Sequence, residues 1–155
     1  MKLSTAVQNG ALLLLVLAVG AMLFGQAAGQ PVLLGYVETG SMENTLAPGD
    51  GYIAVPSFLV DSIEVGDVVA FDPTNINNGN LVTHRVVEET AQGYITKGDA
   101  NPVTDQAGAE PPVQRAQIKA KALEFGGKIV VIPNLGTAVL AVSGVVEWGQ
   151  QQLAS

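Results

Sequence analysis

Ser41, His84, Asp99 and Asp105 are the residues whose types and order in this sequence suit nucleophilic catalysis. A serine hydroxyl becomes a strong nucleophile when a neighbouring base takes its proton and a third group orients that base. An imidazole titrates near neutral pH and is the usual base in such a relay, and His84 is the only histidine of the chain. These residues predict a Ser-His-Asp relay in which either aspartate could be the third member.

Each of these residues also has a structural interpretation. Serine is common in loops, a strand histidine often bonds a backbone carbonyl, and aspartates often cap turns. Lys97 is an alternative base, because serine-lysine peptidases exist. Its place two residues before Asp99 favours an ion pair instead. Residue types alone therefore leave catalytic and structural roles open.

Short strands and turns are predicted to position these residues, because β-branched residues dominate the segments around them. Residues 32–37 should form a strand that leads into Ser41, and residues 81–88 a strand that carries His84. Residues 98–112 form a long polar loop that holds both aspartates. Further strands are predicted within residues 50–60, which Pro56 places at an edge or a break, and within 65–71, 93–97 and 118–125.

Charge and composition exclude several classes of function. The net charge of −7 argues against a nucleic-acid partner, since phosphate binding requires clustered Lys and Arg. The absence of cysteine excludes thiol catalysis, disulfides and cysteine-metal sites. A single histidine makes a histidine-rich metal site impossible. We therefore expect neither a metal ion nor an organic cofactor.

A membrane anchor is predicted at residues 1–30. The chain is 48% hydrophobic and only 14% charged, which is typical of membrane proteins. Residues 11–25 carry no charge, and with the flanks 6–28 they reach the ~20 residues that span a bilayer. The alternative is a cleaved signal peptide, for which residues 26–30 offer small side chains. Lys2 favours a cytoplasmic N-terminus, which would place the residues after the anchor outside.

A second uncharged stretch begins at residue 129 and continues to residue 146. Its start is interrupted by Pro133 and Asn134, and it reaches the spanning minimum of ~17 residues only if residues 129–133 are included. It could be a spanning helix, an interfacial helix, or a final strand followed by a helix. We predict a second membrane helix over residues 129–148, which leaves a β-rich domain at 31–128 and a polar tail at 149–155.

Three segments in this order resemble type I signal peptidases of the archaeal and endoplasmic-reticulum branch. They read GSMENTLAPGD, VTHRVVE and TKGDANPVTD, behind an apolar N-terminal segment. The resemblance covers most of residues 37–105 and the flanking apolar segments, and IVVIPNLG is similar to the C-terminal end of archaeal members. In the eubacterial branch the base is a lysine where this sequence has His84. The resemblance implies a membrane-bound serine endopeptidase that removes signal peptides from secretory precursors.

By this resemblance Ser41 is the nucleophile, His84 the general base and Asp105 the third catalytic member. Asp99 matches a second functionally important aspartate of the same segment. Met42 follows the nucleophile and either lines the substrate cleft or fills the core.

Asn44 departs from the family's pattern, which has proline at that position. Proline would stiffen the turn after the nucleophile. Asparagine can form a similar turn through its side chain, so we expect the site to be retained.

The resemblance also implies a fold and a location. The fold would be a small, mostly β, coiled and barrel-like peptidase domain without a cap domain, held by N-terminal and C-terminal transmembrane helices. It would be integral to the cell membrane, with its catalytic domain extracytoplasmic. Its partners would be secretory preproteins and the lipid bilayer, and the translocation machinery is a further candidate.

Two alternatives remain open. The first is a membrane-anchored, non-enzymatic β binding module of the cell envelope, which would not need Ser41 and His84 to be close together. The second is a related processing peptidase with a narrow set of clients, such as the precursors of surface filaments.

Overall fold

The computed structural model describes residues 7, 9–10, 12–13, 16 and 33–136 of the 155-residue chain. The predicted anchor at residues 1–30 therefore lies almost entirely outside the described part. Residues 137–155, which hold most of the predicted second membrane helix and the tail, lie outside it as well. Among the described residues, no helix combines the length and the apolarity that crossing a bilayer requires.

Short β-strands connected by turns and single 3-10 turns make up the described domain. The strands are β1 (Leu33–Tyr36), β2 (Gly51–Pro56), β3 (Val68–Phe71), β4 (Val82–Thr90), β5 (Gly93–Lys97), β6 (Ile118–Ala122), β7 (Glu124–Phe125), β8 (Lys128–Ile129) and β9 (Val131–Ile132). The 3-10 turns are η1 (Gly40–Met42), η2 (Ser57–Leu59), η3 (Asn77–Gly79), η4 (Asp105–Ala107) and η5 (Arg115–Gln117).

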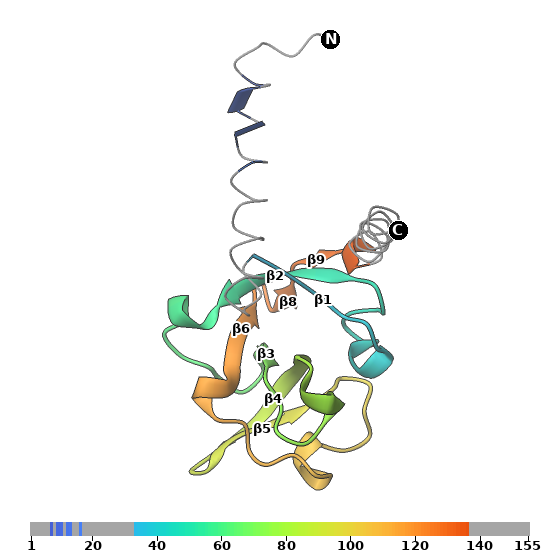
Figure 1. Ribbon diagram of the computed structural model, residues 1–155, viewed down its shortest axis with the longest axis vertical. Coiled ribbons are helices and arrows are strands. Elements are labelled where there is room, and N and C mark those ends of the chain that lie inside the picture. Colours follow the sequence, from blue (N-terminus) through green and yellow to red (C-terminus); the bar gives the residue numbers. More distant parts are fainter. Residues whose placement is uncertain (1–6, 8, 11, 14–15, 17–32, 137–155) are drawn as a thin grey trace, which may run out of the picture.

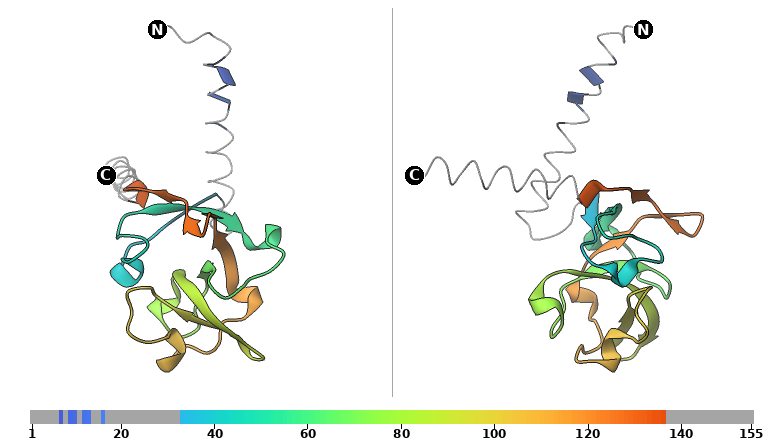
Figure 2. Two further views of the ribbon diagram at one scale, coloured as in Figure 1. Left: turned by 180° about the vertical axis from the view of Figure 1, so that it is seen from behind. Right: turned by 90° about the vertical axis from the view of Figure 1, so that its right-hand side faces the viewer.

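One antiparallel sheet contains most of these strands, in the order β1-β2-β6-β3-β4-β5. β9 pairs with the first residues of β2, and β7 and β8 form a separate hairpin. The sheet curls into a half-barrel, as Figures 1 and 2 show. The prediction of a mostly β, barrel-like domain is therefore confirmed.

The core occupies the inside of this curled sheet. β3 is buried at every position, as expected for a strand covered on both faces, whereas the first half of β4 alternates between more and less buried residues. Two clusters of buried side chains result. One contains Val37, Met42, Leu46, Tyr52, Ala54, Val68, Ala70, Ala120 and Ala122, and the other contains Ile63, Val69, Phe71, Val82, Val86, Val113 and Ile118.

Two strands leave part of their edge unpaired, and both border the candidate site. Within the described residues, β1 pairs along one edge with β2. β4 pairs with β3 through residues 82–85, but its pairing with β5 begins only at Arg85. The start of β4 therefore has a free edge, as β1 does.

The predicted second membrane helix differs from the structure at its start. Residues 128–129 and 131–132 are strands, and helical structure begins only at Leu135. Val130 explains the difference, because its backbone bonds both Ile53 and Leu123. Ile129 and Val131 pack against the core. A short apolar run cannot be assigned to strand or helix by periodicity alone. The β-rich domain thus extends beyond residue 128 to at least Ile132.

Candidate active site

The turn around Ser41 is held by the buried residues that follow it. Thr39 is extended, and the chain then enters η1, in which Glu43 N donates to Gly40 O over 3.1 Å. Met42 and Leu46 are completely buried in the core. They fix the turn from below and leave Ser41 partly exposed at the surface of a cleft. Met42 itself does not line this cleft, so its role is that of core filler.

His84 lies in β4 opposite Val69 of β3, on the strand face that also carries the buried Val82 and Val86. Its Nδ1 lies 2.7 Å from Oδ2 of Asp105, the first residue of η4. Both side chains are largely buried, with exposed fractions of 8% and 6%. Water therefore competes little for this contact, which fixes the plane of the imidazole ring.

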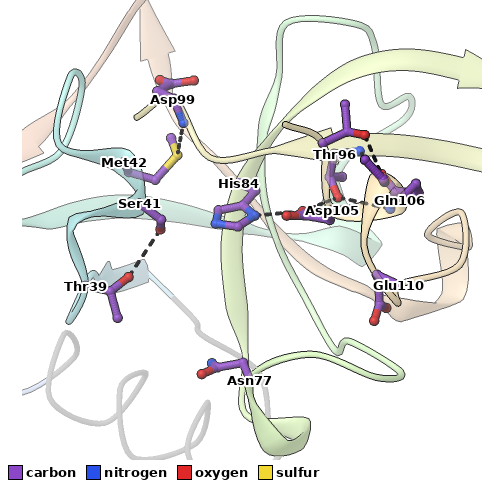
Figure 3. A network of polar contacts seen from close by, with 12 residues as sticks. Thr39, Ser41, Met42, Asn77, His84, Thr96, Asp99, Asp105, Gln106 and Glu110 are labelled. Atoms are coloured by element: carbon purple, nitrogen blue, oxygen red, sulfur yellow. Dashed lines mark hydrogen bonds and ion pairs between the residues drawn. The ribbon is translucent and has the colours of Figure 1, made fainter. Parts of the chain in front are cut away.

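The imidazole lies between Asp105 and Ser41, as Figure 3 shows. Because Nδ1 contacts Asp105, the other ring nitrogen is on the side of Ser41. Among the described residues no hydrogen bond joins Ser41 to His84, and Ser41 Oγ instead lies 3.2 Å from Thr39 Oγ1. A serine hydroxyl has three staggered positions about χ1, and catalytic hydrogen bonds often form only when substrate is bound.

Ser41, His84 and Asp105 line one cleft of about 840 Å³. Its two sides are β1 with the segment up to Ser41, and the β3–β4 connection with the start of β4. The lining residues are Leu34, Gly35, Tyr36, Val37, Glu38, Thr39, Ser41, Asp72, Ile76, Asn77, Asn80, Leu81, Val82, Thr83, His84, Asn101 and Asp105. The cleft is thus bordered by β1 and by the start of β4, the two strands with free edges.

Asp99 is bound elsewhere, so the aspartate at the imidazole is Asp105. Arg85 Nε donates to Asp99 Oδ1 over 2.8 Å and Arg85 Nη2 to Oδ2 over 2.6 Å, and the Thr45 hydroxyl donates to the same Oδ2. The Arg85 hydrogen bonds hold the pKa of Asp99 below its ordinary value against the opposing effect of partial burial. The expected ion pair of Asp99 with Lys97 is not formed, because Arg85 from the neighbouring strand takes that place.

The segment that contains Asp99 also holds the turn around Ser41. Ala100 N donates to Ser41 O over 2.9 Å, and Asp99 N lies 3.3 Å from Met42 Sδ. Asn44 Nδ2 donates to Asp99 O over 3.0 Å, so its side chain links two loops instead of forming the local turn that we expected. A Cβ on Gly98 would lie 2.6 Å from Ser41 O, and glycine therefore permits this close approach.

Three residues of the site were not singled out from the sequence. Thr39 gave no periodic signal, because the chain turns into η1 after it, and this turn places its hydroxyl 3.2 Å from Ser41 Oγ. Thr96 bonds Asp105, and Gln106 bonds Thr96. Neither residue gave a local signal, since these contacts arise only when η4 packs on β5.

No group of acidic and histidine side chains suited to a metal ion occurs in the described part of the chain. The chain matches no model of a known protein family, and a search of curated proteins finds none similar to it.

Proposed function

We propose that this protein is a membrane-bound serine endopeptidase that removes signal peptides from secretory precursors. The observation that carries the proposal is the 2.7 Å contact between His84 Nδ1 and Asp105, in the same cleft as Ser41. A buried carboxylate that orients an imidazole next to a partly exposed serine is the arrangement that acyl transfer by serine requires.

In the proposed reaction the Ser41 hydroxyl attacks the scissile carbonyl while His84 Nε2 takes its proton. Asp105 holds the ring and stabilises the imidazolium that forms. The imidazolium then gives its proton to the leaving amine, and a water molecule, activated by the same base, hydrolyses the acyl-enzyme. The backbone N–H of Ser41 and the hydroxyl of Thr39 are donors beside the nucleophile that can stabilise the developing oxyanion.

The cleft suits an extended peptide with small side chains. A substrate strand can add to the free edge of β1 and supply the backbone hydrogen bonds that the curled sheet lacks there. The Tyr52 ring packs directly against β1, because a Cβ on Gly35 would come within 2.4 Å of it. Tyr52 also reaches Thr83 on the other side of the cleft, at 2.9 Å between the hydroxyl oxygens. A buried ring so close to Gly35 leaves little room beside this part of β1, which would favour small substrate residues before the cut.

The two limits of the described domain support attachment to a membrane. The start of β1 and the end of the described chain lie at the same end of the domain (Figures 1 and 2). Both points continue into largely apolar sequence. Attachment there would confine enzyme and precursor to one plane and raise their effective concentration.

The proposal is tested by cleavage of a model secretory precursor by the purified full-length protein in detergent. We expect Ser41→Ala and His84→Ala each to lower the rate by about 10²-fold to 10⁴-fold or more, because each removes an essential part of the relay. Lys97→Ala is the matched control and should cleave at close to the wild-type rate. Cleavage by His84→Ala at the wild-type rate would refute the mechanism. Binding of the precursor without cleavage by the wild type would favour the binding module.

A further inference from the structure

We propose that Thr96 and Gln106 are positioning residues that hold Asp105 in the orientation needed to bind His84. This inference rests on the proposed serine peptidase function and concerns the same site. The three residues lie next to one another on the side of His84 away from Ser41, as Figure 3 shows.

Thr96 is completely buried in β5, and its hydroxyl lies 2.7 Å from Asp105 Oδ2. The same carboxylate oxygen is 2.7 Å from His84 Nδ1. An ionised carboxylate only accepts hydrogen bonds, so the Thr96 hydroxyl must be the donor. Oδ2 therefore accepts two hydrogen bonds, one from the imidazole and one from Thr96. The second bond fixes the direction in which Asp105 presents its oxygen to the ring.

Gln106 determines where the Thr96 proton points. Its Oε1 accepts from the backbone N–H of Thr96 over 2.8 Å, and this contact sets the orientation of the amide. The Nε2 group then faces Thr96 Oγ1 at 3.5 Å and Pro111 O at 3.2 Å. Because Nε2 can only donate, Thr96 Oγ1 accepts from it and directs its own single proton to Asp105.

The arrangement also ties two elements together. Gln106 follows Asp105 in η4, and both of its amide atoms contact Thr96 in β5. η4 packs on β5, so the carboxylate moves only if this packing changes. The loop that carries Asp105 is otherwise long and polar, and such loops hold a side chain in one orientation only when other contacts fix them.

The decisive experiment uses the only imidazole of the chain. In full-length protein with ¹⁵N-labelled histidine, in detergent micelles, every imidazole signal comes from His84. We expect a strongly downfield Nδ1–H proton in the wild type, because a hydrogen bond to a carboxylate deshields it. In Thr96→Val, which keeps the shape and loses the donor, this signal should move upfield or broaden. Thr96→Ser should retain the wild-type signal.

Precursor cleavage provides the second measurement. Thr96→Val should lower kcat by about 10-fold to 100-fold with KM little changed, since a hydrogen bond to a charged group is lost away from the substrate. Thr96→Ser should restore most of kcat. Thr90→Val is the matched control, because the Thr90 hydroxyl bonds only the nearby backbone of the β4–β5 turn in the described structure.

Gln106→Glu keeps the proposal testable if Thr96→Val does not fold, which circular dichroism would show. Gln106 is only partly buried, and the new carboxylate oxygen would compete with Asp105 for the Thr96 proton. The same upfield change of the His84 signal is expected. The inference would be overturned if the His84 Nδ1–H signal and kcat were both unchanged in Thr96→Val. If Thr96→Val does not fold, the same result in Gln106→Glu would overturn it. Failure of the proposed function gives a different result, whatever the His84 spectrum shows: either the wild type does not cleave the precursor, or cleavage survives Ser41→Ala.

Discussion

Gly98 shows how closely single residues are constrained around Ser41. Its backbone approaches the Ser41 carbonyl so closely that a Cβ would lie 2.6 Å from that oxygen. We predict that Gly98→Ala displaces Ser41 and lowers the precursor cleavage rate by about 10-fold or more, since small displacements of a nucleophile have large kinetic effects.

The matched control for Gly98→Ala is Gly127→Ala in the β7–β8 turn, where φ is 75°. It should lower stability through backbone strain and leave the cleavage rate per folded molecule unchanged. Equal rates for the two variants, after correction for the folded fraction, would show that Gly98 has no role in placing Ser41.

At the scale of elements, the Arg85–Asp99 pair joins β4 to the loop that follows β5. Arg85 lowers the pKa of Asp99 below the ordinary carboxyl value of ~3.9. Such a group stabilises the fold fully above the unfolded value and loses this contribution as the pH falls through the folded value. We therefore predict a loss of stability below about pH 4 that Asp99→Asn reduces, because the amide that replaces the carboxylate carries no charge to lose.

This pH dependence is measured by thermal unfolding between neutral pH and about pH 2, a range that covers ordinary carboxyl titration. Asp61→Asn is the control, because Asp61 is exposed and the structure describes no ion pair for it. Asp99→Asn should also lower stability at neutral pH, where the pair is intact in the wild type. An identical acid slope in the wild type and Asp99→Asn would contradict the prediction.

At the scale of the whole molecule, Tyr52 joins β2 to β4 across the inside of the half-barrel. Burial raises the pKa of Tyr52 to about 12, although the hydrogen bond with Thr83 opposes this effect. A raised pKa contributes stability that is complete below the unfolded value of ~10 and is lost as the pH rises through the folded value. The wild type should therefore lose stability between about pH 10 and 12.

Tyr52→Phe isolates this contribution. It keeps the ring and removes the ionisable hydroxyl, so the alkaline loss of stability should become smaller. At neutral pH the variant should be less stable by about 0.5–1.5 kcal/mol, the usual net value of a hydrogen bond. Chemical unfolding at about pH 8 and about pH 11, on either side of the ordinary tyrosine pKa, provides the comparison. If Tyr52→Phe loses as much stability at alkaline pH as the wild type does, the loss arises from a group other than Tyr52.

The sequence predicted the strands near the site better than it predicted the C-terminal part of the domain. β4 and β5 follow from their β-branched residues and from the turn between them, and β5 has the predicted bounds. β8 and β9 are too short to show a period, and their strand form depends on backbone partners such as Leu123 and Ile53. The apolar run at 129–146 therefore predicted a helix from its first residue, although the start of this run forms strands in the structure.

The sequence by itself determined the chemical groups: one serine in a glycine-flanked turn, one imidazole on a strand and two aspartates in one polar loop. The tertiary structure decided how they are used. Asp105 reaches His84 because η4 packs on β5, while Asp99 bonds Arg85 and Thr45, which follows the turn around Ser41. The physical reason is that a loop carries no periodic pattern that fixes the direction of its side chains. Their partners are set by contacts between residues far apart in the chain, such as Thr45 with Asp99.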